Sequence, residues 1–229
     1  MKKFTLIELL VVIVIIAILL SLLMPSLTHA KAKAKVIVCS GSQKQLYLGF
    51  VQYSKDNSGK LPYGESPVGW RVSSWEWRIG PYTGVHFTEA KISSNNWVAP
   101  RNNPLLFCPQ DPYKKATSNI GFARSYVTSS VEYWHSSASD YGVIGSAWSR
   151  RLANIQSAAL LLTEDHRNHD YKIQGSSWAS AMGDWSWPNA IKSTHPREKF
   201  NYLYIDGHVE NLEADEISRD NYEILKSKL

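Results

Sequence analysis

The chain has 229 residues, a formal net charge of +5 and a sequence pI near 9.1. This length leaves room for one membrane anchor and one soluble domain with its own hydrophobic core. The basic excess does not indicate nucleic-acid binding, because no nucleic-acid motif accompanies it. The G-x-S-x-G, P-loop and H-E-x-x-H patterns of common enzymes are absent from the sequence. We therefore expect a protein that is not an enzyme.

Residues 4–24 form an apolar run whose only polar side chains are Thr5, Glu8 and Ser21. About 20 apolar residues in a helix cross the roughly 30 Å hydrocarbon core of a bilayer, so the run predicts a transmembrane helix. A secretory signal peptide is the competing interpretation, but its apolar region would have only about 7–15 residues. Retention of the whole run is therefore the favoured expectation.

Glu8 is the one ionisable side chain within this run. A carboxylate at membrane depth is costly and needs a partner. Two interpretations stay open: Glu8 lies near the headgroups and is solvated there, or it pairs with the N-terminal amine of a neighbouring helix in an assembly. Beyond the run, Lys31, Lys33 and Lys35 are typical of contact with lipid headgroups.

Residues 25–57 keep helical character after Pro25, which removes one backbone hydrogen bond and predicts a kink. The D-N-S-G sequence at 56–59 is a helix stop signal. From residue 4 to residue 57 the helix would be a rod of about 80 Å. Six residues at steps of three and four define one face that would pack on a sheet: Cys39, Ser42, Leu46, Gly49, Phe50 and Tyr53.

Cys39 and Cys108 are the two cysteines of the chain. A disulfide between them is consistent with export to an oxidising compartment, and two separate buried thiols are an equally favoured alternative. Neither cysteine has a C-x-x-C partner, so the spacing does not predict a zinc site.

The rest of the sequence predicts a small sheet with long loops. Residues 60–104 indicate a long loop that holds short strands or a short helix. Alternation around Asp206 and Gly207 predicts a hairpin with a two-residue type I′ turn. Apolar runs predict strands at 105–111 (ending in a C-P-x-D turn), 125–128 and 158–163, with the hairpin at 199–212 and a helix at 214–229.

The N-terminal sequence KKFTLIELLVVIVIIAILLSLLMP resembles the N-terminal segment of type IV prepilins and of the pseudopilins of type II secretion systems. The matching features are the basic residues Lys2 and Lys3, Phe4 at the processing point, Glu8 within the apolar run, and Pro25. The family usually has Gly directly before the cut, where this chain has Lys3.

This resemblance implies that a prepilin peptidase cuts between Lys3 and Phe4 and methylates the new Phe4 amine. It also implies that Glu8 pairs with the N-terminus of an adjacent subunit and that Pro25 belongs to the assembly helix. The N-terminus would face the cytoplasm of a bacterium, the single helix would cross the inner membrane, and the head would be extracytoplasmic.

The implied domain organisation has four parts. Residues 1–3 are a leader peptide, 4–24 the transmembrane helix, 25–57 its continuation and 58–229 a globular pseudopilin-like head. The expected fold class is α+β, with a long N-terminal helix packed on a small antiparallel sheet with long loops, as in pilins.

A second resemblance involves His195, Asp206 and Gly207. They are similar to the H-x9-DG motif of some prepilin-type proteins, although ten residues separate His195 from Asp206 here. No catalytic role follows from this motif.

A metal site is a further hypothesis for the C-terminal half. His195, Asp206 and His208 would converge near one end of the hairpin and would be joined by acidic and imidazole side chains able to bind calcium or another metal. The favoured alternative is a hydrophilic loop without a cofactor. The additional ligands would be Glu164, Asp165, His166, His169 and Asp170.

Two functions are compatible with these features. The first is a pilin-like or pseudopilin structural subunit, whose partners are other such subunits, the prepilin peptidase and the membrane. The second is a monomeric, membrane-tethered protein that binds a glycan or a protein through loop aromatics such as Trp185 and Trp187. A metal-dependent hydrolase is the least favoured hypothesis.

Overall fold

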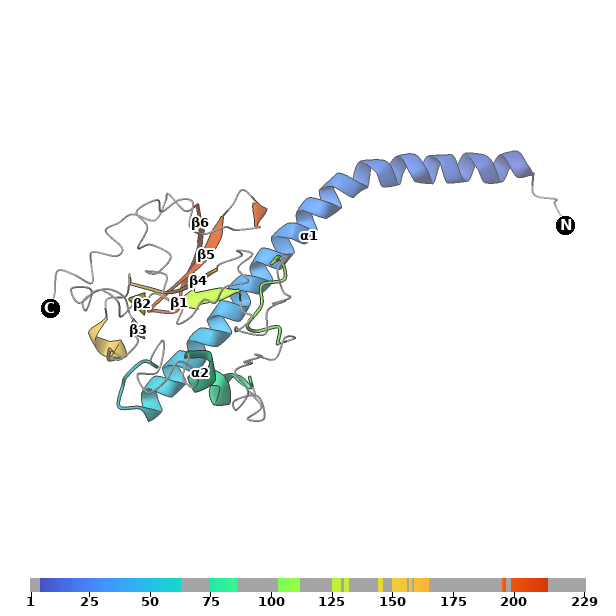
Figure 1. Cartoon of the computed structure of the whole chain (residues 1–229). Coiled ribbons are helices and arrows are strands. Elements are labelled where there is room, and N and C mark those ends of the chain that lie inside the picture. The colour runs from blue at the N-terminus through green and yellow to red at the C-terminus, as the bar shows by residue number, and fades with distance from the viewer. Residues whose placement is uncertain are drawn as a thin grey trace.

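The computed structural model combines one long helix with a small antiparallel sheet, which is the expected α+β arrangement (Figure 1). It describes residues 5–62, 75–85, 103–111, 125–128, 130–131, 144–145, 150–155, 157, 159–164, 195–196 and 199–213. The predicted helix at 214–229 and the leader at 1–3 lie outside the described residues.

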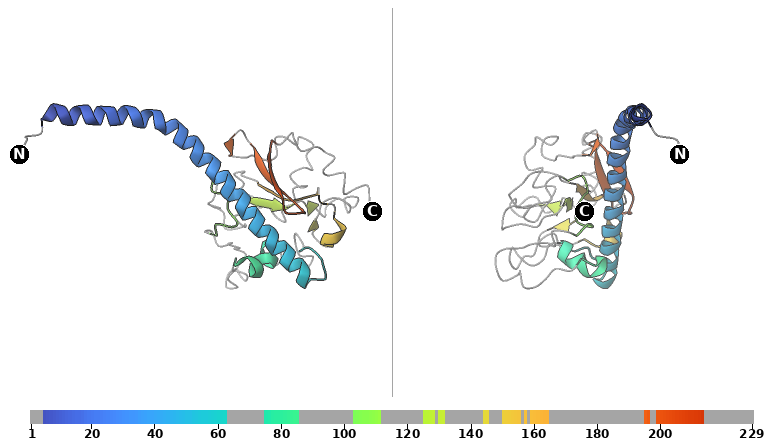
Figure 2. Two further views of the ribbon diagram at one scale, coloured as in Figure 1. Left: turned by 180° about the vertical axis from the view of Figure 1, so that it is seen from behind. Right: turned by 90° about the vertical axis from the view of Figure 1, so that its right-hand side faces the viewer.

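Helix α1 (Leu6–Asp56) is a single element of 51 residues. Its N-terminal half extends away from the head, whereas its C-terminal half lies along the head (Figures 1 and 2). It holds an 18-residue window of mean hydropathy 3.3, none of which is buried. By length and composition this helix is able to span a membrane, so an N-terminal membrane anchor is compatible with the structure.

The end of α1 agrees with the stop signal. The backbone N–H of Asn57 donates to the carbonyls of Tyr53 and Ser54, and Ser58 and Gly59 both have positive φ, of 56° and 79°. Left-handed backbone after the last helical turn is a common way to end a helix. Pro25 lies within α1, and Figure 1 shows the helix curved rather than straight.

The head-facing side of α1 is the predicted one. All six residues of the predicted face are buried, together with Gln43 and Ser54. Lys44, Gln45, Gln52 and Lys55 on the other side are exposed. The helical period therefore identified correctly which side of α1 packs on the head.

A second helix, α2 (Trp75–Thr83), lies against the C-terminal end of α1. The Trp75 ring stacks on Phe50 with centroids 5.3 Å apart, and the Tyr82 hydroxyl donates to Asp56 Oδ2 at 2.9 Å. α2 is the short helix that the sequence left open as one alternative for residues 60–104. Trp75 is thus part of the core rather than of an exposed loop.

The main sheet has four antiparallel strands in the order β1-β4-β5-β6. Separate from it, two short strands pair in parallel and a short 3-10 helix follows them. The strands of the main sheet are β1 (Tyr126–Thr128), β4 (Leu160–Glu164), β5 (Phe200–Tyr204) and β6 (Val209–Leu212); the others are β2 (Ser130–Val131), β3 (Ile144–Gly145) and the 3-10 helix η2 (Leu152–Asn154).

Strand β5 is buried on both faces. Asn201 and Leu203 lie on the side of α1, and Phe200, Tyr202 and Tyr204 alternate with them but are buried too. The alternation in the sequence predicted the strand correctly but did not separate a buried from an exposed face, because a central strand is covered on both sides.

The hairpin turn differs from the predicted type I′ turn. Gly207 has φ 89°, but Asp206 does not have the positive φ that type I′ needs. Gly207 N–H donates to the Tyr204 carbonyl at 3.0 Å, and Tyr204 N–H donates to the His208 carbonyl at 3.0 Å. These bonds define a three-residue loop with glycine in the left-handed position. A Cβ at Gly207 would also lie 2.5 Å from the Tyr47 ring.

The strand predicted within 105–111 is wrong, whereas the turn predicted at its C-P-x-D end is confirmed, since the Asp111 N–H donates to the Cys108 carbonyl at 3.1 Å. Residues 103–111 form turns, although Leu106, Phe107 and Cys108 are buried as expected for an apolar run. The Leu106 carbonyl accepts a hydrogen bond from the Ser125 N–H at 2.9 Å. Burial of this segment is therefore achieved by packing beneath α1 and β1 rather than by strand pairing.

Candidate functional site

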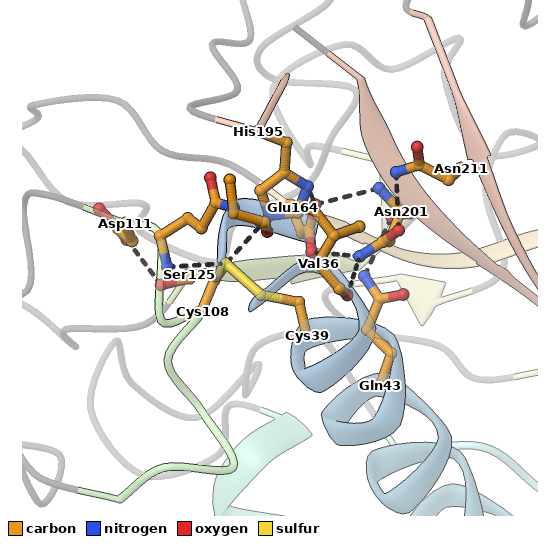
Figure 3. The surroundings of a disulfide bond; sticks show 12 residues. Val36, Cys39, Gln43, Cys108, Asp111, Ser125, Glu164, His195, Asn201 and Asn211 are labelled. Atoms are coloured by element: carbon orange, nitrogen blue, oxygen red, sulfur yellow. Dashed lines mark hydrogen bonds and ion pairs between the residues drawn. A yellow bond between two sulfur atoms is a disulfide. The ribbon is translucent and has the colours of Figure 1, made fainter. Parts of the chain in front are cut away.

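Four segments that are distant in sequence meet in a buried cluster (Figure 3). Cys39 comes from α1, Cys108 from the turn segment 103–111, Glu164 from the end of β4 and His195 from the chain before β5. All four residues are buried. We call these four residues the disulfide cluster.

Cys39 and Cys108 form a disulfide, with Cα atoms 5.2 Å apart. Of the two alternatives that the sequence left open for the cysteines, the structure contains the first. The bond closes a loop between residues that are 69 positions apart and joins α1 to the head covalently.

His195 connects the disulfide to the carboxylate. Its Nε2 atom lies 3.1 Å from Cys108 Sγ, and its Nδ1 atom lies 3.1 Å from Glu164 Oε2. One nitrogen of the imidazole therefore contacts the sulfur and the other contacts the carboxylate, and these two contacts fix the orientation of the ring.

Asn201 holds Glu164 from the other side. Its backbone N–H donates to Glu164 Oε2 at 3.0 Å, and its side-chain Nδ2 donates to Glu164 Oε1 at 2.9 Å and to the Val36 carbonyl at 3.2 Å. Gln43 Nε2 donates to the Asn201 carbonyl at 3.0 Å. Asn201 thus connects the cluster, β5 and two turns of α1, as Figure 3 shows.

The Cys108 segment is held by a second set of polar contacts. Ser125 Oγ donates to Asp111 Oδ2 at 2.6 Å next to the start of β1. Gln110 Nε2 donates to the Ala32 carbonyl on α1 at 2.6 Å. The first bond gives the buried carboxylate of Asp111 a donor, and the second ties the turn segment that carries Cys108 to α1.

Burial dominates the electrostatics of the cluster. It raises the pKa of Glu164 from 4.5 to about 8, against the lowering effect of the two hydrogen bonds from Asn201. Burial, and then the nearby charge of Glu164, raises the pKa of Tyr126 above its ordinary value. Because the ionised carboxylate is disfavoured inside the head, we expect Glu164 to hold or share a proton with His195 at neutral pH.

This raised pKa predicts a pH-dependent stability. The folded protein takes up a proton at Glu164 that the unfolded chain releases between pH 4.5 and about 8. The free energy of unfolding of the oxidised protein should therefore fall as the pH rises through this window. Urea unfolding of the full chain in detergent, followed by tryptophan fluorescence at several pH values, measures this slope.

The matched variant for this prediction is Glu164→Gln, which keeps the size of the side chain but does not titrate. Its unfolding free energy should depend less on pH than that of the wild type across the same window. An equally steep slope in the variant would show that other groups cause the pH dependence.

The N-terminal end of α1 is the second place where a predicted site residue is described. Glu8 Oε2 accepts hydrogen bonds from Thr5 N at 2.8 Å and Thr5 Oγ1 at 2.7 Å, and Glu8 N–H donates to Thr5 Oγ1 at 3.3 Å. This is a capping box, in which the two residues satisfy the free groups of the helix terminus. Thr5 was not among the partners expected for Glu8, although the T-x-x-E spacing at 5–8 indicates a capping box.

The expected convergence of His195 with Asp206 and His208 is wrong. His195 precedes β5 and Asp206 follows it, and a strand of five residues is about 16 Å long. Asp206 instead forms a close ion pair with His208 Nδ1 at the hairpin turn. The two parts of the H-x10-DG motif therefore lie at opposite ends of β5.

Three groups of predicted site residues lie outside the described residues: the processing residues Lys3 and Phe4, the loop residues Asp165, His166, His169 and Asp170, and the aromatic residues Trp185 and Trp187. Pro25 lies in the exposed half of α1. Glu164 was grouped with these loop residues in the metal-site hypothesis, and its carboxylate lies in the disulfide cluster.

Sequence reasoning missed the polar residues that support the cluster, namely Asn201, Gln43 and Ser125. The one available signal was the polar residue Asn201 within the aromatic and aliphatic run of β5. No known protein family, curated protein or solved structure matches this chain.

Proposed function

We propose that the chain is a pilin-like structural subunit of the pseudopilin class, anchored in the membrane by α1 before it assembles into a type II secretion or type IV pilus-like filament. The observation that carries this proposal is the division of one continuous helix into two halves. The N-terminal half is apolar and exposed, and the C-terminal half packs on the sheet of the head.

The exposed half of α1 needs a cover. Its large apolar side chains are solvent-exposed along the helix, from Leu6 at 81 % exposed to Leu27 at 68 % exposed. A continuous apolar surface of this length is not stable in water, so it must lie in lipid or against other apolar surfaces. A bilayer before assembly and the helices of neighbouring subunits afterwards would each supply such a cover.

The outward side of the C-terminal half carries two exposed apolar residues among exposed polar ones such as Lys44 and Gln45. Ile37 is 71 % exposed and Leu48 is 65 % exposed. The two residues lie on one side of α1, because eleven residues are about three helical turns. Gly41 lies between them and would leave space for a neighbouring helix, since no atom lies within 4 Å of its Cβ position. This surface supports lateral packing of α1 in a filament.

Glu8 supplies a test that separates pairing between subunits from helix capping, because its carboxylate accepts hydrogen bonds from Thr5 of the same chain. In a filament the carboxylate would also pair with the N-terminal amine of a neighbour. Glu8→Val should abolish filament assembly while the chain still enters the membrane fraction. Thr5→Ala removes the hydroxyl of the capping box but keeps the carboxylate, so assembly should persist.

Assembly is measured by sedimentation of sheared filaments and by cross-linking in cells that contain the native chain. Normal assembly of Glu8→Val would rule out the proposed pairing. Equal loss of assembly in Thr5→Ala and Glu8→Val would show that Glu8 acts only as a helix cap.

The tethered binding protein remains the second candidate. The observation that favours it is the capping box itself, since Thr5 gives Glu8 a partner without any neighbouring subunit. Mass spectrometry of the N-terminal peptide from native membranes separates the two candidates. A chain that begins at N-methylated Phe4 supports the filament subunit, whereas an intact Met1 supports the permanent tether.

A further inference from the structure

The filament role uses α1 and leaves the disulfide cluster without a function. The sulfurs of Cys39 and Cys108, one nitrogen of His195 and one carboxylate oxygen of Glu164 all lie within 4.8 Å of one another. Four donors from four separate segments meet there, at a place from which solvent is excluded. Such a convergence is costly unless the donors are satisfied together.

The donors are of the types that zinc binds. Zinc takes four ligands in a tetrahedron from thiolates, imidazoles and carboxylates, and the donors of such a site are about 3.3–3.8 Å apart. Cys108 Sγ and His195 Nε2 are 3.1 Å apart. The Cα atoms of the two cysteines are 5.2 Å apart. Opening of the disulfide, together with a rotation of the Glu164 carboxylate, which now contacts the other nitrogen of the His195 ring, would bring all four donors onto one ion.

The surroundings also resemble a supported metal site. Metal-binding imidazoles and carboxylates are usually oriented by hydrogen bonds from outside the ligand set. Here Asn201 donates twice to Glu164, through its backbone and its side chain, and is itself anchored to α1 through Val36 and Gln43. Asn201 thus holds Glu164 beside the two cysteines without itself having to move.

We propose that the reduced protein binds one zinc ion through Cys39, Cys108, His195 and Glu164, and that formation of the disulfide abolishes this site. A dithiol reductant would convert the Cys39–Cys108 disulfide to two thiols and become a disulfide itself. Zinc would then bind both sulfurs as thiolates and Glu164 as a carboxylate, releasing the two thiol protons and the proton that Glu164 holds or shares with His195. A small-molecule disulfide reverses this: it takes two electrons from the two thiolates, takes up two protons and becomes two thiols. The zinc ion leaves, because two sulfurs that are bonded to each other no longer act as thiolate ligands.

The two states would occur under different redox conditions. Thiols persist in the reducing cytoplasm, and disulfides persist outside it. The zinc-bound form would tie α1 to the head through the same two residues that the disulfide joins after oxidation. The head would therefore have a covalent or metal-mediated link to α1 in either redox state.

Cobalt titration of the full chain in detergent tests this proposal. The protein is reduced with a phosphine, freed of it under argon and titrated with Co²⁺, followed by Zn²⁺. We expect one Co²⁺ per chain, with the intense visible bands of a tetrahedral ion and a near-ultraviolet sulfur-to-cobalt band that Zn²⁺ removes. The oxidised protein should show none of these bands.

His195→Gln should weaken cobalt binding by at least tenfold, as is typical for loss of one ligand or its support. His208→Gln is the matched control, because His208 lies at the hairpin turn with Asp206 and outside the cluster. It should bind cobalt like the wild type. Absence of the tetrahedral spectrum in the reduced wild type, or equal binding by His195→Gln, would overturn the proposal.

Alkylation supplies a second measurement that does not depend on cobalt. Zinc should protect both thiols of the reduced wild type from iodoacetamide, as counted by mass spectrometry, and should not protect those of His195→Gln. Circular dichroism before each titration verifies that α1 and the head are folded. Equal alkylation with and without zinc in a folded wild type would contradict the proposed site.

Discussion

Replacement of both cysteines by alanine, Cys39→Ala with Cys108→Ala, should lower the free energy of unfolding of the head by about 4 kcal/mol. The disulfide closes a loop between residues 69 positions apart. In the chain-entropy account, a cross-link over a loop of that length lowers the conformational entropy of the unfolded chain, which raises its free energy by about 4 kcal/mol. Alanine is used because a serine hydroxyl would add a buried polar group at each position.

Urea unfolding of the full chain in detergent measures this loss, with the wild type under oxidising conditions as the reference. Addition of reductant to the wild type, in the presence of a metal chelator, should reproduce most of the loss. The same reductant should leave the double variant unchanged. A change of less than about 1 kcal/mol in the double variant would show that packing alone holds Cys108 against α1.

Asn201→Leu should lower the free energy of unfolding by about 3 kcal/mol. The substitution keeps a side chain of similar size but removes two donors, to Glu164 Oε1 and to the Val36 carbonyl, and the acceptor for Asn211. Glu164 would lose a hydrogen bond inside the head, and a buried polar group without its partner is costly. The effect therefore comes from the groups left behind as well as from the bonds removed.

Asn211→Ala is the matched control. Asn211 lies on β6, is exposed, and donates a 2.9 Å hydrogen bond to Asn201 Oδ1. Its loss should cost less than about 1 kcal/mol, because water replaces an exposed partner. Similar losses in the two variants would mean that Asn201 does not support Glu164 in the way that the distances indicate.

The sequence by itself determined the parts of the fold that depend on near neighbours. The period of α1 predicted its buried side, since residues three and four apart share a face of any helix. The D-N-S-G sequence predicted where α1 ends, and the alternating aromatic run predicted β5. The same local patterns failed where two structures satisfy one pattern, as in the turn at Asp206 and Gly207 and in the buried segment at 105–107.

The tertiary structure alone decided the disulfide cluster. Cys108 and His195 are 87 positions apart, and Gln43 and Asn201 are 158 positions apart. Their contacts depend on how α1 crosses the sheet and on which face of β5 it covers, and no spacing in the sequence encodes that crossing. The absence of a C-x-x-C pattern was therefore uninformative about metal binding, because chain folding, rather than short spacing, brings these four donors together. A buried polar residue such as Asn201 is explained only by its partners, since burial without them would be unfavourable.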